Sequence, residues 1–345
     1  MSGGDPHRVL LVGAGGVGCK RAAAITAHAD TRLVAVCDVD GSAATELADQ
    51  CGATAYTDWP SAIGETDVDL VVVSTTHDVL ATVSVAALQA GRHVLCEKPL
   101  GRNREEVATA VAAATACDRV LRAGYNHRFH PAIVRLHSAA ISGRLGPLIS
   151  LRGRYGHGGR PGYDREWRAD PAISGGGELL DQGAHLLDLC RWLLGDFASV
   201  VAHTQTAFWD MPVEDNAFAL LRTEAGQVAS VHVSWTQWRN LFSLELFGRD
   251  GYATAEGLGG SYGAERFTLG LRSAQGGAPA EETELFDAAD PSWELEWAAF
   301  VHAIEGGSSP GADGGDGLVT MEWIQRVYAS AGASGAPVSA AATPW

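Results

Sequence analysis

The feature that most constrains the fold is an apolar run followed directly by a glycine-rich turn near the start of the chain. Residues 9–12 are Val-Leu-Leu-Val, residues 13–18 are Gly-Ala-Gly-Gly-Val-Gly, and a helix-like segment follows. This strand–turn–helix order is the setting in which Gly-x-Gly-x-x-Gly binds a dinucleotide. Gly13 permits the tight turn, Gly15 lets a pyrophosphate approach the backbone, and Gly18 lets the helix pack against the strand.

The residues around this turn predict which dinucleotide binds. Gly16 and Val17 open the helix, whose unpaired N–H groups are predicted to face the phosphates. The next strand, Leu33–Cys37, ends at Asp38, twenty residues beyond Gly18. A carboxylate there accepts hydrogen bonds from the adenosine ribose and repels a 2′-phosphate, which favours NAD over NADP. The alternative is a glycine turn that binds no ligand.

Strands and helices continue to alternate up to residue 124. Apolar runs at 70–73, 93–96 and 119–123 are separated by helical patterns at 79–90 and 104–116. This alternation predicts an α/β domain with a parallel doubly wound sheet, in which ligands bind at the carboxyl ends of the strands. The polar residues that directly follow these strands are therefore predicted to line the cofactor: Ser74, Thr75, Thr76, His77, Glu97 and Lys98.

After Gly124 the pattern changes, and we expect two domains, 1–124 and 125–345. A helical pattern up to residue 142 and a strand at 147–155 precede a polar, glycine-rich loop at 156–176. Short strands separated by turns then predict an α+β domain with a large open antiparallel sheet. These strands are expected at 199–209, 216–223, 228–238, 243–248 and 251–256, with helices at 293–304 and 318–331 after them.

A helical pattern that follows three glycines, 175–177, carries the strongest candidates for proton transfer. Asp181 and His185 are four residues apart, so on one continuous helix they share a face. A carboxylate beside an imidazole suits proton transfer near neutral pH. The alternative is an ordinary ion pair, or a buried histidine held by an acid.

Lysine is scarce, which draws attention to Lys98. Lys20 and Lys98 are the two lysines of the chain, and arginine supplies all other permanent cations. Lys98 follows a predicted strand end and precedes Pro99, which restricts the local backbone. A compact ammonium group there can stabilise a developing alkoxide, whereas the alternative is an ordinary surface lysine.

The charge balance disfavours several classes of partner. The 345 residues carry a formal net charge of −16, which argues against nucleic acid and anionic membrane surfaces. Residues 273–325 contain eleven acidic residues and no Lys or Arg, either as a solvated face or as an attraction for a cationic substrate. No apolar run is long enough to span a bilayer, and no signal-peptide pattern is present, so we expect a cytoplasmic protein. The six cysteines lack zinc-site spacing, and we expect no metal.

Taken together, these motifs resemble the glucose–fructose oxidoreductase / inositol dehydrogenase / rhizopine catabolism (Gfo/Idh/MocA) family. The resemblance rests on the glycine turn, Asp38, Glu-Lys-Pro at 97–99, Asn126-x-Arg128, and Gly-Gly-Gly-Glu-Leu-Leu-Asp-Gln-Gly-Ala-His at 175–185, and it spans nearly the whole chain. The sequence departs from the family after the strand at 70–73. There the family usually has Thr-Pro and a histidine four residues later, and this chain has Thr76 and Leu80.

The resemblance implies an NAD(P)-dependent oxidoreductase that acts on sugars or cyclitols. The catalytic lysine, aspartate and histidine of the family fall on Lys98, Asp181 and His185. Further cofactor contacts are expected at Asn126, Trp167 and Arg168. Substrate contacts are expected from Lys98, Arg128, Arg154, Tyr155, Tyr163, Asp181 and His185. The open sheet and the habit of the family imply a homodimer or homotetramer.

The sequence predicts the substrate less precisely than the cofactor. Five arginines between residues 152 and 168 could hold an anionic group, such as the diphosphate of a nucleotide sugar. The acidic balance points instead to a neutral or cationic glycoside, and the loop resembles family members from aminoglycoside biosynthesis. We therefore favour a dehydrogenase for an aminosugar-containing glycoside. The alternatives are a nucleotide-sugar ketoreductase or dehydrogenase, an inositol-type dehydrogenase, and a non-catalytic NAD-bound sensor.

Overall fold

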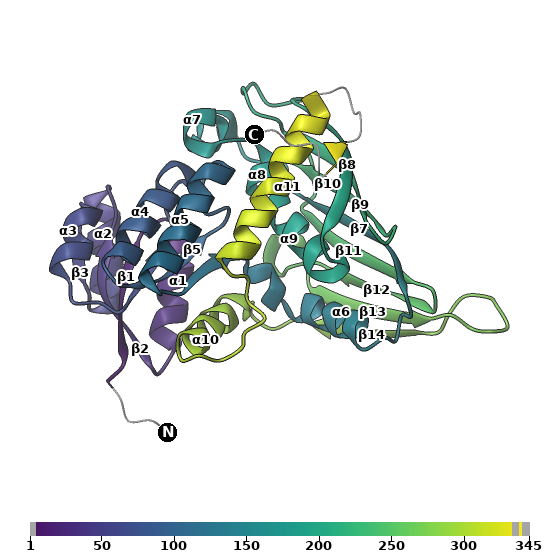
Figure 1. Cartoon of the computed structure of the whole chain (residues 1–345), viewed down its shortest axis with the longest axis horizontal. Coiled ribbons are helices and arrows are strands. Elements are labelled where there is room, and N and C mark those ends of the chain that lie inside the picture. The colour runs from purple at the N-terminus through teal and green to yellow at the C-terminus, as the bar shows by residue number, and fades with distance from the viewer. Residues whose placement is uncertain (1–4, 333–337, 340–345) are drawn as a thin grey trace. The chain divides into compact units, whose positions relative to one another are not determined.

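The computed structural model describes residues 5–332 and 338–339 (Figure 1). The chain forms two compact units. The first unit contains the residues up to Asn126 together with Ser292–Val319, and the second contains His127–Pro291 and the residues from Thr320 onward. The chain therefore returns to the first unit after building most of the second. The expected division into 1–124 and 125–345 does not include this return.

The first unit contains a parallel sheet, as predicted. Its six strands are ordered β3-β2-β1-β4-β5-β6, and every neighbouring pair is parallel. The strands are β1 (His7–Val12), β2 (Thr31–Cys37), β3 (Thr54–Tyr56), β4 (Leu70–Val73), β5 (His93–Glu97) and β6 (Leu121–Gly124). Strand β3 was not predicted, because it has three residues, all at least partly exposed, and so lacks an apolar run.

Helices connect these strands, in the α/β order that the alternation predicts (Figure 1). They are α1 (Gly16–Ala27), α2 (Gly41–Cys51), α3 (Trp59–Glu65), α4 (His77–Gln89) and α5 (Arg104–Cys117). Helix α4 begins at His77 rather than at Val79. Thr76 takes the extended backbone of an N-cap, and Asp78 places a carboxylate in the first turn, where the helix dipole favours negative charge.

Helix α10 (Ser292–Ile304) explains why the chain returns to the first unit. Trp297, Phe300 and Val301 are buried in the same apolar core as β1 and β2. The indole N–H of Trp297 donates to the hydroxyl of Thr31 at 3.1 Å. A fully buried tryptophan contributes a large apolar area, so α10 is an integral part of this core despite its distance in the sequence.

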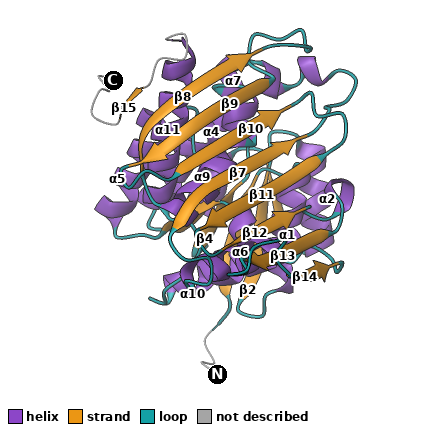
Figure 2. Ribbon diagram, turned by 90° about the vertical axis from the view of Figure 1, so that its right-hand side faces the viewer, coloured by secondary structure: helices purple, strands orange, loops and turns teal. Residues whose placement is uncertain are grey.

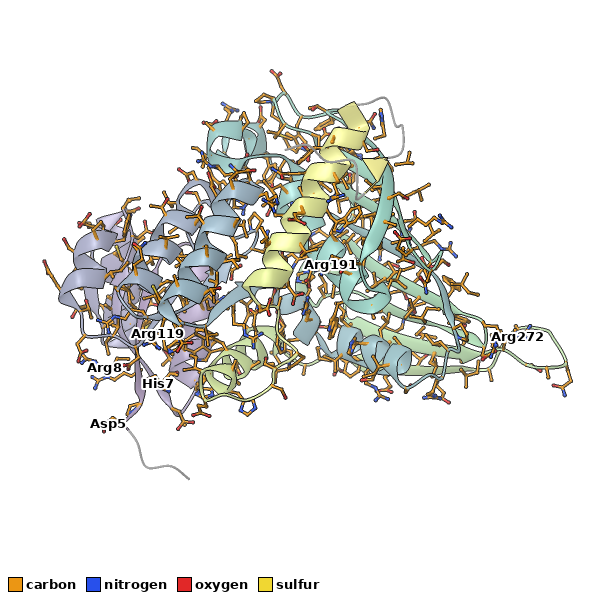
Figure 3. All side chains as sticks on the ribbon, in the orientation of Figure 1. Asp5, His7, Arg8, Arg119, Arg191 and Arg272 are labelled. Atoms are coloured by element: carbon orange, nitrogen blue, oxygen red, sulfur yellow. The ribbon has the colours of Figure 1, made fainter. Side chains whose placement is uncertain are left out.

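The amino-terminal edge of the parallel sheet carries a half-buried histidine. His93 begins β5, and its Nδ1 accepts a hydrogen bond from the N–H of Val120 at 3.0 Å. Burial lowers the pKa of His93, and the positive charges of Arg119 and His7 lower it further. Figure 3 labels Arg119 and His7 on this unit. The opposite edge of the sheet, at the carboxyl ends of the strands, is the one predicted to bind ligand.

The second unit contains a large, mostly antiparallel sheet, as predicted, with one parallel pair of strands. Its order is β14-β13-β12-β11-β7-β10-β9-β8-β15, and β7 and β10 run parallel while the other pairs are antiparallel. The strands are β7 (Leu148–Gly156), β8 (Phe197–Gln205), β9 (Asn216–Thr223), β10 (Val228–Ser234), β11 (Leu241–Gly248), β12 (Gly251–Glu256), β13 (Glu265–Leu271), β14 (Glu281–Phe286) and β15 (Val338–Ser339).

Two groups of residues differ from the expected strands of this sheet. Strands β13, β14 and β15 were not predicted, and β14 carries mostly exposed acidic residues that hide the alternation of a buried face. Strands β8 and β10 end at Gln205 and Ser234, earlier than expected, so residues 206–215 and 235–240 are loops. Both loops are rich in aromatic residues.

Helices of the second unit pack on one face of this sheet. In Figure 2 the strands lie side by side in front of α6 (Pro131–Ile141) and α9 (Gly183–Leu194). Helix α9 packs on β7, where a Cβ at Gly153 would lie 3.3 Å from Leu186. The expected loop at 156–176 contains two 3₁₀ turns and α7 (Pro171–Ser174), and α8 (Glu178–Asp181) follows it. Helix α11 (Gly314–Gly332) belongs partly to each unit. Among the described residues, no helix combines the length and apolarity that a membrane span needs.

Candidate active site

The glycine turn has the close backbone approaches that its sequence predicts. Gly13 has a φ of +103°, and a Cβ there would lie 2.4 Å from the carbonyl oxygen of Ser74. A Cβ at Gly18 would lie 2.0 Å from the carbonyl oxygen of Gly13. By contrast, a Cβ at Gly15 or Gly16 would meet no atom within 4 Å. Two glycines thus close the turn on β1 and β4, and two leave open space at the start of α1 for a phosphate.

Asp38 is tied to this turn and suits an adenosine ribose. It follows β2, and its Oδ2 accepts the N–H of Ala14 at 2.7 Å while its Oδ1 accepts the N–H of Asp40 at 2.9 Å. Each carboxylate oxygen has a second lone pair for a ribose hydroxyl. A 2′-phosphate would meet like charge there. The neighbouring Val39 is 91% exposed and offers apolar surface beside the carboxylate. These residues fit NAD.

The polar residues after β4 form the next wall at this edge of the sheet. The hydroxyl of Ser74 donates to the carbonyl oxygen of Gly13 at 2.9 Å, which fastens the end of β4 to the glycine turn. Thr75 donates to the carbonyl oxygen of Thr76, whose own hydroxyl donates to Asp78 at 2.6 Å. His77, the first residue of α4, is buried. These side chains follow β4 as predicted.

Glu97 has a structural partner that the sequence did not indicate. Arg21 of α1, fully buried, donates from Nε to Glu97 at 2.7 Å and forms a second ion pair with Glu296 at 2.6 Å. Burial by itself would lower the pKa of Arg21, but Glu296 and Glu97 raise it above the ordinary value. A Cβ at Gly124 would lie 2.9 Å from this guanidinium. Glu97, which was expected to contact the cofactor, therefore fixes the end of β5 to α1.

Lys98 is held by this fixed strand end. It directly follows β5, is half-buried, and its peptide bond to Pro99 is cis. Asn126 lies at the end of this unit's first segment and donates from Nδ2 to the hydroxyl of Ser292 at 2.8 Å. Both residues remain candidates for the cofactor or substrate contacts that the sequence predicts.

Asp181 and His185 do not lie on one continuous helix. Helix α8 ends at Asp181, and α9 begins at Gly183, so Gln182 separates them. The N–H of His185 donates to the carbonyl oxygen of Gln182 at 3.1 Å. Both residues are buried. A simple four-residue helical spacing therefore does not describe the pair.

Glu214 anchors the start of α8, and sequence reasoning missed it. Its carboxylate accepts the N–H groups of Gly177 at 3.1 Å and Leu179 at 3.0 Å, and the hydroxyl of Tyr328 at 2.8 Å. Burial raises the pKa of Glu214, although these donors act against the rise. A Cβ at Gly177 would lie 2.0 Å from the carbonyl oxygen of Glu214, and one at Gly176 would lie 2.4 Å from the hydroxyl of Tyr328. The glycines before the pair therefore make room for Glu214 and Tyr328 of the same chain.

Asp181 has a strong cationic partner. Arg168 donates from Nε to its Oδ2 at 2.9 Å, and the guanidinium lies over the ring of Trp167 at 4.4 Å from the centroid. Trp167 and Arg168 were expected to contact the cofactor. Within the second unit, Arg168 orients the carboxylate of Asp181 and Trp167 packs against Arg168, while the contact of both residues with the cofactor stays a prediction. A carboxylate held on one side by a guanidinium has other lone pairs for a substrate hydroxyl.

His185 belongs to a buried aromatic group. Its ring stacks on that of His127, with centroids 3.7 Å apart and an interplanar angle of 21°. Tyr155 contacts both rings edge-on or tilted, at 6.4 Å from His185 and 5.3 Å from His127. Burial, followed by the charges of nearby groups, raises the pKa of Tyr155 well above its ordinary value. Gln182 donates to the hydroxyl of Tyr262 at 3.3 Å and closes the group.

The loop after β7 contributes a second histidine–tyrosine pair. Burial lowers the pKa of His157, whose Nδ1 accepts the N–H of Gly159 at 2.9 Å. Tyr163 lies edge-on to His157 at 5.5 Å, and burial followed by the charge of Asp181 raises the pKa of this phenol far above its ordinary value. A neutral imidazole and a neutral phenol therefore lie near Asp181 and Arg168.

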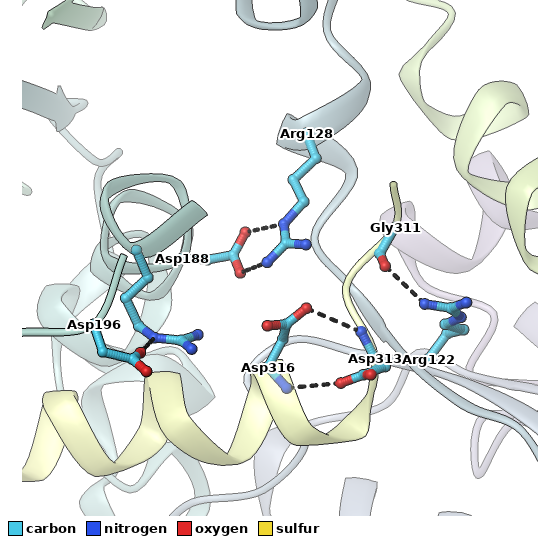
Figure 4. A network of polar contacts seen from close by, with 8 residues as sticks. Arg122, Arg128, Asp188, Asp196, Gly311, Asp313 and Asp316 are labelled. Atoms are coloured by element: carbon cyan, nitrogen blue, oxygen red, sulfur yellow. Dashed lines mark hydrogen bonds and ion pairs between the residues drawn. The ribbon is translucent and has the colours of Figure 1, made fainter. Parts of the chain in front are cut away.

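Two predicted substrate residues are not part of this group. Arg128 and Asp188 form a buried two-pronged ion pair, with N–O distances of 2.8 and 2.6 Å (Figure 4). Arg154 alternates with Tyr155 along β7 and so points to the opposite face of the sheet. Its side chain is half exposed there and lies 3.9 Å from Glu245. Both arginines thus pair with carboxylates of the second unit, and their contact with a substrate stays a prediction.

A further cluster has the composition of a metal site. Ligand atoms of His130, Glu265 and Asp290 all lie within 4.8 Å of one another. Glu265 accepts the N–H of Ala132 at 3.2 Å and lies 2.6 Å from Nδ1 of His130. The carboxylate of Glu265 thus caps the start of α6 and pairs with the imidazole of His130.

The fold and these residues define a dinucleotide-dependent oxidoreductase. The model of the NAD-binding Rossmann-fold oxidoreductase family matches residues 7–125, and that of the Gfo/Idh/MocA C-terminal domain matches residues 133–254. The chain belongs to the Gfo/Idh/MocA family of oxidoreductases.

Three known proteins illustrate this similarity. The 1,5-anhydro-D-fructose reductase of Ensifer adhaerens is 33% identical, over 75% of this chain and 76% of the relative. The D-glucoside 3-dehydrogenase of Escherichia coli is 28% identical, over 95% of this chain and 96% of the relative. Among solved structures, GenD2 from gentamicin A biosynthesis, in complex with NAD, is 27% identical with a TM-score of 0.84, over 97% of both chains.

Proposed function

We propose that this NAD-dependent oxidoreductase transfers hydride between nicotinamide and a secondary ring hydroxyl of a sugar or cyclitol. The observation that carries the proposal is the buried group of His185 and Asp181 in a chain that also has a complete NAD turn with Asp38. The names of the relatives, a sugar reductase and a glucoside dehydrogenase, support this chemistry.

In this proposal His185 is the general base. NAD, when bound, accepts the hydride. Its imidazole takes the hydroxyl proton as the hydride leaves carbon, a role that typically contributes a factor of about 10²–10⁴. Stacking on His127 holds the plane of the imidazole ring. A ring that is already oriented loses little entropy in the reaction, which favours proton transfer.

Asp181, Tyr155 and Lys98 supply the remaining groups. Asp181, oriented by Arg168, accepts a hydrogen bond from a substrate hydroxyl. Tyr155 keeps its proton because its pKa is raised, so it can only donate to or accept from a substrate hydroxyl as a neutral phenol. Lys98 stabilises the developing alkoxide through its positive charge. Tyr163 is proposed to contact the same ring.

For the substrate, we favour an aminosugar-containing glycoside. GenD2, from gentamicin A biosynthesis, supports this choice. The arginines that favoured a nucleotide sugar are mostly engaged: Arg168 with Asp181, Arg160 with Glu166 at 2.7 Å, and Arg154 on the far face of the sheet. A diphosphate would have to displace these carboxylates, so a neutral or cationic ring fits better.

The test is cofactor reduction, followed by absorbance of NADH, with a panel of aminoglycosides, simple glycosides, inositols and nucleotide sugars. We expect the largest kcat/KM for glycosides that contain an aminosugar. Preference for UDP-sugars would support the ketoreductase alternative, and preference for inositols the cyclitol alternative. Tight NAD binding without turnover on any of them would favour a sensor.

We also propose that the protein is a homodimer or homotetramer, assembled through the helix-free face of the large sheet. Phe218 and Leu220 of β9 are 40% and 53% exposed on that face. Apolar side chains in such positions are typical of interfaces. Sedimentation equilibrium at several concentrations tests this, and a monomer at all of them would contradict it.

A further inference from the structure

Beside the candidate site lies a group of three aromatic rings, the exposed Phe208 and Trp238 and the partly exposed Trp209, which we call the aromatic shelf. Phe208 is 60% exposed and Trp238 is 64% exposed. The ring of Phe208 contacts Trp209 edge-on at 5.2 Å and Trp238 edge-on at 4.7 Å. The three rings come from the loops 206–215 and 235–240, where the sequence predicted longer strands. Large aromatic side chains at this exposure usually mark a binding surface.

The shelf is rigidly held. The fully buried carboxylate of Asp215 accepts three successive backbone N–H groups, those of Ala207, Phe208 and Trp209, at 2.8, 2.8 and 3.1 Å. The indole N–H of Trp209 donates to the carbonyl oxygen of Trp235 at 3.0 Å. Burial would raise the pKa of Asp215, but these donors hold it below its ordinary range, so the clamp stays ionised. A ligand that binds here would meet preorganised rings, which lowers the entropic cost of binding.

Glycines bring the loop after β7 directly onto the shelf. A Cβ at Gly158 would lie 3.1 Å from the ring of Trp238. Gly159 has a φ of +68°, and a Cβ there would lie 2.6 Å from the ring of Trp209. Side chains at these two positions would push the rings away, so the glycines place the shelf against the residues that precede Tyr163.

The shelf is continuous with the candidate site. Trp209 contacts Tyr163 at 5.8 Å, and Tyr163 contacts His157 at 5.5 Å. The charges of Asp181 and Arg168 act on both Tyr163 and His157. A row of rings therefore leads from the proposed catalytic aspartate outward to solvent, entirely within the second unit. A ligand ring on Phe208 and Trp238 would therefore lie within three ring-to-ring contacts of Tyr163, whose own side chain is buried.

We propose that the aromatic shelf is a binding subsite for a second ring of the substrate, a sugar or cyclitol linked to the ring that is oxidised. This proposal rests on the proposed function. The flat C–H face of such a ring covers the exposed indole and phenyl surfaces, while its hydroxyl or amino groups stay in water. The protein is thus built for glycosides of at least two rings, and simple monosaccharides leave the shelf bare.

The experiment compares substrates that differ by one ring. Steady-state kinetics are measured for methyl α-glucoside against maltose, and for methyl α-glucosaminide against a glucosaminyl-2-deoxystreptamine. The variants are Trp238→Ala and Phe208→Ala, with Trp238→Phe as a conservative replacement. Leu285→Ala on β14, a 67% exposed apolar residue, is the matched control. Thermal melting and sedimentation confirm that each variant keeps its fold and assembly.

We expect KM for the two-ring substrates to rise in both alanine variants, with kcat unchanged. A stacked aromatic contact of about 0.5–1.5 kcal/mol corresponds to roughly a 2- to 13-fold change. Kinetics with the one-ring substrates should stay the same, Trp238→Phe should restore most of the loss, and Leu285→Ala should change nothing.

Three outcomes would overturn the subsite. Equal losses with one-ring and two-ring substrates would show that the shelf only supports the catalytic group. Unchanged KM for all substrates would show that no ring contacts it. Dissociation of the assembly in Trp238→Ala would show an interface between copies. Failure of the proposed function is distinct, because the unmodified protein would then turn over neither class of substrate.

Discussion

The NAD turn of the first unit and the proposed catalytic group of the second are built in opposite ways. The turn consists of backbone: Gly13, Gly18 and the end of β4 approach one another so closely that no side chain fits between them. The group around His185 consists of side chains that converge from distant segments, including Glu214, Tyr328 and Arg168. A site built from backbone can be recognised in the sequence by its glycines, whereas a site built from converging side chains has no such pattern.

The largest effect tests whether the two regions have separate tasks. In His185→Ala and in Lys98→Ala, turnover should fall by roughly 10²–10⁴, since a general base or an alkoxide partner is lost. The affinity for NAD, followed by calorimetry, should stay within about twofold, since the turn and Asp38 are intact. His28→Ala provides a control at a histidine outside both regions. Near-normal turnover in both active-site variants would contradict the proposed roles.

The next test compares two glycines of the NAD turn: Gly18, which packs against backbone, and Gly16, which has open space around it. Gly18→Ala places a Cβ 2.0 Å from the carbonyl oxygen of Gly13, so the turn must shift. We expect NAD binding to be lost and the free energy of unfolding to fall by about 1–3 kcal/mol, as for overpacking. Gly16→Ala, where no atom lies within 4 Å, should keep its stability and lose only affinity for NAD. Urea unfolding with calorimetry measures both, and equal stability of the two variants would contradict the assignment.

A third test concerns Glu214, which belongs to the site that is built from converging side chains. Glu214→Gln leaves one of the buried N–H groups of Gly177 and Leu179 without its acceptor, which costs about 1–3 kcal/mol. Because these groups begin α8, we expect a lower kcat as well as lower stability. Tyr328→Phe removes one donor and keeps the carboxylate, so it should have a smaller effect on both. The two variants are compared by kcat and by thermal melting. Lost stability with an unchanged kcat would show that Glu214 supports the fold and not the catalytic group.

The same contrast explains how much could be predicted. The parallel sheet, the NAD turn and Asp38 follow from local alternation and glycine spacing, and the structure contains them as expected. The partner of Glu97 could not be predicted, because Arg21 lies on α1, far away in the sequence, and the second acid that pairs with Arg21, Glu296, comes from the still more distant α10.

In the second unit, the local sequence pattern misled the prediction of how side chains are arranged. Asp181 and His185 looked like a helical pair, yet Gln182 divides the helix between them. Arg154 looked like a neighbour of Tyr155, but successive residues of a strand point to opposite faces. The stacking of His127 on His185 joins segments far apart in the chain, and no spacing rule indicates it.

The smallest expected effect lies at the edge of the first unit away from the NAD turn. Burial, with the charges of Arg119 and His7, lowers the pKa of His93 in the folded state, so the unfolded chain binds a proton more readily. Stability linked to His93 is therefore complete above the unfolded pKa of about 6.5 and is lost as pH falls through the folded pKa. His93→Gln should show a shallower fall in the free energy of unfolding between pH 7 and pH 5 than the unmodified protein. His302→Gln, at an exposed histidine of the same unit, should not. NAD affinity at pH 7 should be unchanged in both, because the ligand edge is built from other residues; a loss of affinity in His93→Gln would show that the two edges of the sheet are coupled.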